Sequence, residues 1–276
     1  MVIVYDHPLS PYGQKVKIAL LEKGVPFQAV MPDAIGSGST AGEFAQASPR
    51  GEVPALIDGD VAVFDSTIIL EYIEDRWPEP SLLPADPAER ARMRMLEDVM
   101  DTHFEAINWG LSEITNFQRA TGELAETIAA KAAQQTRSWF AWLEQQLGDA
   151  PWFNGEQFGW GDLSVVPYVN GSAGFDLAPD TSSRLGQWLI RANQRESVKS
   201  CSEAAAAVAF DSPAVSLEQV RQAMEAGLFK REYRDHRLEW MIKSGGLSVV
   251  EQGLAKNNIR FIEPFASAQP DKQADK

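Results

Sequence analysis

The chain has 276 residues, of which 44% are hydrophobic and 23% charged, a composition typical of a globular protein with one large or two modest domains. Its net charge of −14 makes nucleic acid and anionic membrane surfaces unexpected partners, because binding to either requires clustered cations. No apolar run reaches the ~18–20 residues of a membrane-spanning helix and no signal peptide is recognisable, so a cytoplasmic location is expected.

The first eighty residues alternate strand and helix patterns. Short runs of β-branched and aromatic residues predict strands at Val2–Tyr5, Phe27–Met31, Val53–Ile57 and Val61–Phe64. Asp58-Gly59 separates the last two as a tight hairpin. One helix is expected to begin at Ser10-Pro11, because serine caps helices and proline suits their first position, and a second to run from Asp65-Ser66 to about Trp77-Pro78. Gly36–Ser39 is typical of a flexible loop.

Beyond a proline-punctuated linker the patterns become helical. Helices are predicted over Ala88–Thr121, Gly122–Leu147, Asp162–Tyr168, Leu185–Asn193 and Ser202–Val208, and then over Ser216–Leu228, Arg231–Lys243 and Leu247–Ala255. Phe261-Ile262 are expected to pack an apolar end onto the body, and residues 266–276 to form a disordered tail. The expected organisation is an α/β domain (1–80), an all-α domain (88–210) and a helical C-terminal extension (211–265).

Two helix starts carry candidate binding chemistry. The unpaired N–H groups at a helix N-terminus favour anions, and the Ser10 hydroxyl there can donate a hydrogen bond to a bound thiolate. At Asp65-Ser66, the serine and the first-turn N–H groups can hold a carboxylate and the aspartate can hold an ammonium, which suits the α-amino-acid end of a ligand. In both places plain helix capping is the alternative. No G-x-S-x-G elbow marks Ser10 as a hydrolase nucleophile.

Three stretches of the sequence resemble a cytosolic glutathione transferase. They are LSPYGQKVKIALLEKGVPF, SPRGEVPALIDGDVAVFDSTIILEYIEDRWP and PWFNGEQFGWGDLSVVPY, and the likeness covers about residues 1–209. Its most specific part is VPAL followed by DSTIILEYIE at the family's spacing. The resemblance, to serine-type members of the bacterial etherase and tau-like kind, implies a thioredoxin-like α/β domain followed by an all-α domain, and a homodimer.

The resemblance also assigns a glutathione site. Glutathione would be the co-substrate, and Ser10 would be the catalytic residue that stabilises its thiolate. Val53, preceding a cis Pro54, would pair its backbone with the cysteinyl part of glutathione. Asp65 and Ser66 would hold the γ-glutamyl end.

Other positions depart from the family or compete with Ser10. Glu52, counted among the glutathione-binding residues, stands where Gln or Lys is frequent, so its charge is expected to weaken binding of the glycyl carboxylate. The family's Ser/Thr-x-x-Asp cap appears as Gly159-x-x-Asp162, and Asp162 is expected to be structural. Tyr5 is a rival catalytic group, expected instead to pack in the core. The single cysteine, Cys201, is expected to be buried and inert, and with three scattered histidines we expect no metal.

A hydrophobic electrophile is expected to bind between the two domains. The candidate lining residues are Pro11, Tyr12, Met100, His103, Phe104 and Ile107. The last four share one helical face, a spacing that fits a pocket lining or a core. Of the six, His103 alone is considered as a general acid. The segment 211–265 either closes over this cleft or extends a subunit contact.

The expected function is therefore that of a glutathione transferase. Its thiolate would attack an electrophilic carbon of a small aromatic, halogenated or ether substrate, as in detoxification. The alternative is a non-catalytic binding or regulatory protein that kept the fold, because a fold does not by itself confer activity. Glu52 and the added C-terminal segment are the features that favour this alternative.

Overall fold

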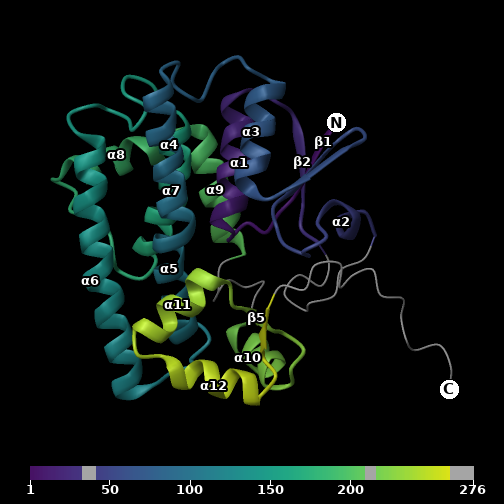
Figure 1. Cartoon of the computed structure of the whole chain (residues 1–276), viewed down its shortest axis with the longest axis vertical. Helices are drawn as coiled ribbons and strands as arrows, with labels where there is room; N and C mark the ends of the chain where they lie inside the picture. The colour runs from purple at the N-terminus through teal and green to yellow at the C-terminus, as the bar shows by residue number, and fades with distance from the viewer. Residues whose placement is uncertain (33–41, 209–215, 262–276) are drawn as a thin grey trace.

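The computed structural model describes residues 1–32, 42–208 and 216–261. The predicted loop at Gly36–Ser39, Ile262 and the predicted tail at 266–276 lie outside the described residues. An α/β unit and a helical unit lie side by side, and the C-terminal segment lies below them in Figure 1. Among the described ranges, none of the helices combines the length and the apolar character that a membrane crossing requires.

The first unit is a four-stranded mixed sheet with the order β2-β1-β3-β4. Its elements are β1 (Val2–Tyr5), α1 (Pro11–Glu22), β2 (Phe27–Val30), α2 (Gly42–Ala47), β3 (Ala55–Asp58), β4 (Val61–Phe64) and α3 (Ser66–Arg76). Strands β1 and β2 are parallel, whereas β3 is antiparallel to both β1 and β4. Asp58 pairs with Val61, so the predicted hairpin is confirmed. The Val53–Pro54 peptide bond is cis and lies directly before β3.

The second unit is helical. Its elements are α4 (Pro87–Val99), the π-helical turn η1 (Met100–Phe104), α5 (Glu105–Thr115), α6 (Gly122–Leu147), α7 (Trp160–Ala173), α8 (Arg184–Asn193) and α9 (Glu196–Ala207). The predicted helix over Ala88–Thr121 is therefore interrupted by a wider turn, which a hydrophobic pattern of α-helical period does not reveal. The predicted bounds of α6 are confirmed.

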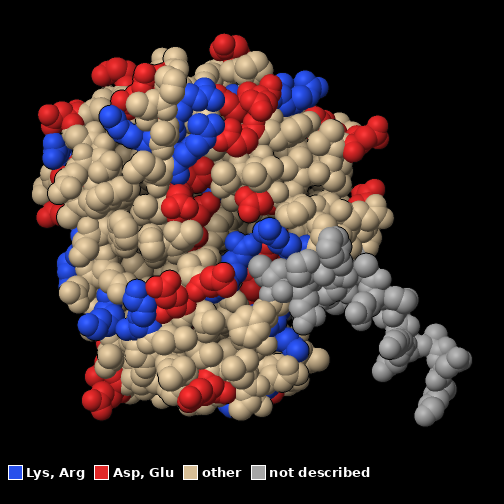
Figure 2. Space-filling model, viewed as in Figure 1, with Lys and Arg blue, Asp and Glu red and all other residues tan. Residues whose placement is uncertain are grey.

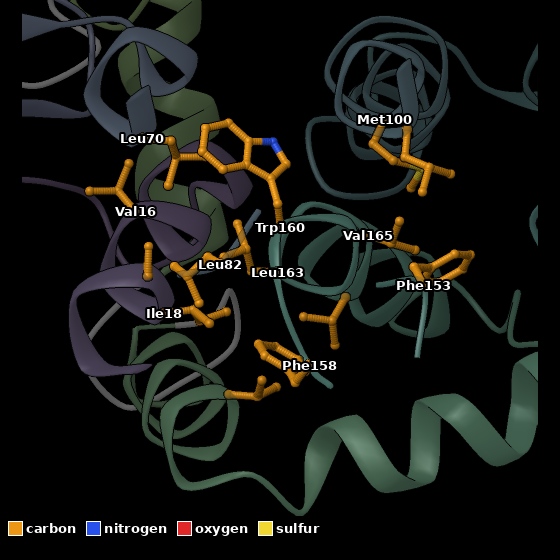
Figure 3. Close-up of a cluster of buried hydrophobic side chains, with 14 of the residues drawn as sticks. Val16, Ile18, Leu70, Leu82, Met100, Phe153, Phe158, Trp160, Leu163 and Val165 are labelled. Carbon is orange, nitrogen blue, oxygen red and sulfur yellow. The ribbon is translucent and has the colours of Figure 1, made fainter. Parts of the chain in front are cut away.

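One hydrophobic core joins the two units. Val16 and Ile18 of α1 and Leu70 of α3 lie in the same cluster as Trp160 and Leu163 of α7, and all five side chains are almost fully buried (Figure 3). Because this core is shared, the relative position of α1 and α7 is determined by packing, and so is the width of the cleft between the units.

The C-terminal extension, here the described residues 216–261, packs on α5 and α6. It contains α10 (Leu217–Glu225), β5 (Arg231–Glu232), α11 (Asp235–Lys243), α12 (Leu247–Ala255) and β6 (Ile259–Arg260). Trp240 and Met241 belong to a second hydrophobic cluster together with residues of α5 and α6. Gly110 of α5 allows this approach, because a Cβ there would lie 2.0 Å from the Trp240 ring.

Two details of the extension differ from the prediction. The predicted helix over Arg231–Lys243 begins only at Asp235, because β5 instead pairs in parallel with β6. This pairing joins residues almost thirty positions apart, which local sequence patterns do not show. Phe261 is 49% exposed, so the apolar end predicted to pack onto the body does not do so at this residue.

Candidate active site

A cleft of about 1460 Å³ lies between the first unit, the helical unit and the extension. Its walls are the start of α1, the segment before β3, the start of α3, α4 to α5, α7, and the extension around β5 and α11. The described part of the extension therefore supplies one wall of the cleft. In Figure 2, cationic side chains gather at the middle of the face where the extension approaches the first unit.

Ser10 lies at the wall of this cleft and caps α1. Its Oγ accepts a hydrogen bond of 3.2 Å from the N–H of Gly13, and Pro11 occupies the first helical position. Within the described residues, the Ser10 hydroxyl hydrogen has no acceptor, so it is available to a ligand. The cap and the free donor coexist, because a hydroxyl both accepts and donates.

The residues predicted to bind glutathione line the same cleft. Val53 and Pro54 precede β3, and Asp65 caps α3 by accepting a 3.1 Å hydrogen bond from the N–H of Thr67. Ser66 is the buried first residue of that helix. Asp65 has a φ of 75°, a left-handed conformation that is rare for a residue other than glycine and is concentrated at ligand sites. The structure thus brings both helix starts to one cavity.

Glu52, also in this wall, is paired with the extension. Arg234 donates two hydrogen bonds to its carboxylate, of 3.0 and 2.6 Å, across 182 positions of sequence. Burial and the neighbouring Glu232 carboxylate raise the pKa of Glu52 to about 7, against the opposite effect of Arg234. The negative charge of Glu52, which was expected to disturb glutathione binding, is therefore paired with the Arg234 guanidinium. Sequence spacing does not reveal this pair.

A buried ion-pair network borders the cleft. Lys15 of α1 is fully buried, and its Nζ lies 2.6 Å from Glu97 and 2.5 Å from Asp101. Glu97 also accepts hydrogen bonds from Trp160 Nε1 and Thr67 Oγ1. One cation thus joins α1 to two carboxylates of α4 and η1, about one and a half helical turns after Ser10.

Of the six residues predicted for the electrophile site, the structure places two in the cleft wall and four outside it. Pro11 and Tyr12 line the cleft. Met100, Phe104 and Ile107 are fully buried in the core, which is the alternative that their spacing left open. The remaining residue, His103, is exposed and stacks on Trp139 at 5.5 Å, away from the lining.

The physical reason for the placement of His103 is the π-helical turn. Its wider turn rotates His103 off the face that Met100 and Phe104 share. The cleft is lined instead by the neighbouring face of the same helices, namely Glu97, Asp98, Asp101, Thr102, Glu105, Asn108 and Trp109. This face is largely polar, so a search for apolar stripes misses it.

Aromatic side chains form the far end of the cleft. Phe117 and Phe229 stack with ring centroids 6.2 Å apart. The Arg231 guanidinium lies 4.3 Å from the Phe117 ring centroid and 5.1 Å from that of Trp109. Two of these four residues come from the extension, and the sequence patterns singled out none of them.

The structure also shows the surroundings of Tyr5, Asp162 and Cys201, which the sequence analysis had considered. Tyr5 is buried, its ring lies beside Phe44, and it is outside the cleft lining. Asp162 accepts hydrogen bonds from the N–H of Phe153, the N–H of Gly159 and Trp188 Nε1, a structural role. Cys201 is buried, and burial raises the pKa of its thiol to about 11. In the described ranges, no three His, Cys, Asp or Glu side chains are grouped as metal ligands would be.

Comparison with known proteins identifies the family of this chain. The family model described as "Glutathione S-transferase, N-terminal domain" matches residues 4–81. Glutathione S-transferase U22 of Arabidopsis thaliana is 30% identical over 206 residues, which are 71% of this chain and 88% of that protein. The chain belongs to the glutathione S-transferase family.

Solved structures agree with the fold of this glutathione S-transferase. A glutathione S-transferase from Rhodospirillum rubrum has a TM-score of 0.63 at 24% identity and covers 77% of this chain and 94% of its own. A rice glutathione S-transferase in complex with glutathione has a TM-score of 0.57 at 25% identity, with 80% and 93% covered. The predicted family, the two-part fold and the enzyme class are confirmed.

Proposed function

We propose that this glutathione transferase joins glutathione to a hydrophobic, aromatic electrophile, and that Ser10 stabilises the glutathione thiolate. The observation that carries the proposal is the Ser10 hydroxyl: it is oriented by Gly13 and keeps its hydrogen for a ligand. The start of α3 lines the same cleft, and its Asp65 and Ser66 suit the γ-glutamyl end. The rice relative solved with glutathione supports the choice of co-substrate.

The proposed reaction begins with the glutathione thiol that Ser10 would contact. A free cysteine-like thiol has a pKa of ~8.5, so a hydrogen bond from Ser10 and the positive end of α1 would favour its anion near neutral pH. The thiol loses its proton to the solvent, a sulfur–carbon bond forms, and the halide or ether oxygen leaves with the bonding electron pair. Addition to an activated double bond needs the same thiolate.

The aromatic end of the cleft supports an aromatic second substrate. Trp109, Phe117 and Phe229 offer ring surfaces, which stack favourably on another ring. Conjugation of such electrophiles is a detoxification reaction, and we place it in the cytoplasm. The single, buried Cys201 is consistent with a reducing compartment.

Replacing Ser10 with alanine tests the catalytic role. We expect kcat/KM with glutathione and an aryl halide to fall about 10- to 100-fold, because a hydrogen bond to a charged group is worth ~1.5–3 kcal/mol. The pKa of bound glutathione, measured by thiolate absorbance, should rise in parallel. Ser10→Thr keeps the hydroxyl and the helix cap and serves as the control. An alanine variant with full kcat and an unchanged thiol pKa would assign Ser10 to capping alone.

The face formed by α3 and α4 supports a homodimer. Ile68 is 56% and Met95 58% exposed, and Arg94 bonds Glu71 with 2.6 and 2.9 Å contacts, so the two helices present one surface. Exposed apolar side chains beside an ion pair are typical of a protein interface.

Replacing Met95 with glutamate tests this interface. Sedimentation should show twice the chain mass for the native protein and the single chain mass for Met95→Glu, because the variant places a charge in an apolar contact. Leu254→Glu, at a position 52% exposed on α12, is the matched control and should leave the mass unchanged. A native protein that sediments as a single chain would rule out the dimer.

A further inference from the structure

Asp101 is a titratable side chain in the cleft to which the mechanism above assigns no role. It lies on η1, and its side chain is 14% exposed and lines the cleft. Tyr12, two positions after Ser10, donates a 2.7 Å hydrogen bond to the main-chain carbonyl of Asp101. The turn that carries Ser10 is therefore tied directly to the residue that carries this carboxyl group.

The two carboxylates beside Lys15 have different environments. Glu97 is 2% exposed, and its oxygens accept hydrogen bonds from Lys15, Thr67 and Trp160, so it is fully engaged. Asp101 accepts from Lys15 and, at 2.6 Å, from the Tyr168 hydroxyl, and part of its surface faces the cleft. One lysine neutralises only one carboxylate, so the second carries excess negative charge.

The charge balance around Asp101 favours proton uptake near neutral pH. Burial raises its pKa to about 6; Glu97 on α4 raises it as well, while Lys15 on α1 and the Tyr168 hydroxyl on α7 oppose the shift. The pKa of Glu105, the nearby carboxylate of α5, is shifted in the opposite direction. Burial would raise the pKa of Glu105, but Arg237 and His236 on α11 lower it to about 2. Glu105 therefore stays ionised, whereas Asp101 can exchange a proton near neutral pH.

We propose that Asp101 is the general acid of the electrophile half of the cleft, positioned by Tyr168. In its neutral form it donates its proton to the substrate atom that receives the electron pair. When thiolate attacks an ether, the sulfur–carbon bond forms, the carbon–oxygen bond breaks, and the oxygen takes the proton. When it attacks an α,β-unsaturated ketone, the enolate takes the proton. Asp101 then recovers a proton from the solvent, which receives the one lost by the thiol.

This role narrows the substrate class and rests on the proposed function. Ethers and unsaturated carbonyl compounds need a proton on the departing or accepting atom, whereas a halide leaves as a stable anion. General acid catalysis contributes typically 10²–10⁴-fold where such a proton is needed. The geometry thus points to ethers and unsaturated carbonyl compounds as the preferred substrates.

The test compares 4-phenylbut-3-en-2-one with 1-chloro-2,4-dinitrobenzene, each with glutathione, as a ratio of kcat/KM values over pH. Thiolate formation is common to both reactions and cancels in the ratio. In the native enzyme the ratio should fall as the pH rises through about 6, because the neutral form of Asp101 is lost. Asp101→Asn should lower the ratio at low pH by ~100-fold or more and abolish its pH dependence.

Two further variants separate this role from a structural one. Tyr168→Phe removes a hydrogen bond that lowers the pKa of Asp101, so the fall in the ratio should move to higher pH. Glu97→Gln removes a carboxylate that raises the pKa of Asp101, so the fall in the ratio should move to lower pH, opposite to the shift in Tyr168→Phe. A flat ratio in the native enzyme, or the same profile in Tyr168→Phe as in the native enzyme, would overturn the proposal. If the proposed function itself fails, neither electrophile reacts with glutathione.

Discussion

Replacing Lys15 with methionine is expected to lower the free energy of unfolding by about 3–5 kcal/mol at neutral pH. The side chain is fully buried and pairs with Glu97 and Asp101, so the variant leaves two carboxylates in the interior without a cation. Methionine has nearly the length of lysine, and little of the loss can therefore come from a cavity. The uncompensated charge dominates the effect.

The pH dependence of this loss has a definite sign. Burial already raises the pKa of Asp101 from 3.8 to about 6 in the native protein. A group with a raised pKa contributes stability that is present below its unfolded value and is lost as the pH rises through the folded value. Removal of Lys15 raises this pKa further. The difference between variant and native protein should therefore shrink as the pH falls from 7 towards 4.

Denaturant unfolding at several pH values measures the effect. The control is Lys256→Met, which removes an exposed pair with Glu225, 52% and 65% exposed, and should cost less than ~1 kcal/mol. Equal losses of stability in the two lysine variants, or a loss at Lys15 that does not change with pH, would contradict this explanation, in which unpaired buried carboxylates cause the loss.

Sequence patterns predicted the first unit well, because its signals are local. Ser10-Pro11 and Asp65 place the two helix starts within a few residues of their caps, and the hairpin at Asp58 has a two-residue signal. These are also residues of the proposed glutathione site, so half of the cleft wall was predicted from short motifs. The pair at Val53-Pro54 was assigned by family resemblance and lies in the same wall.

The other half of the cleft was not predictable, for two physical reasons. The π-helical turn changes which residues share a face, so His103 points away and Asp101 faces the cleft. The extension adds Arg234 and Phe229 from positions far along the chain, and such pairings depend on tertiary packing alone. Glu52 and the added segment had suggested a non-catalytic protein when each was considered separately. In the structure, they form one wall of the cleft.

Replacing Arg234 with alanine is expected to loosen the extension and weaken glutathione binding together. Arg234 and Glu52 are 25% and 16% exposed, so the pair is only partly screened, and its loss should cost about 1–3 kcal/mol. The variant leaves Glu52 beside Glu232, where burial and that neighbour already raise the pKa of Glu52 to about 7. The destabilisation should therefore be larger at pH 8, where Glu52 is ionised, than at pH 6.

A double-mutant cycle identifies the origin of this loss. Because Glu52→Gln removes the charge that Arg234 balances, the double variant should lose less than the sum of the two single variants, both in thermal midpoint and in KM for glutathione. Lys243→Ala is the matched control on α11, since its pair with Glu239 is 73% and 66% exposed and lies on the helix surface. Strict additivity of Arg234→Ala and Glu52→Gln would mean that the contact is not energetically coupled. If the two substitutions are coupled in thermal midpoint but not in KM, the Arg234–Glu52 pair only holds the extension in place. If they are coupled in both quantities, the extension contributes to the glutathione site.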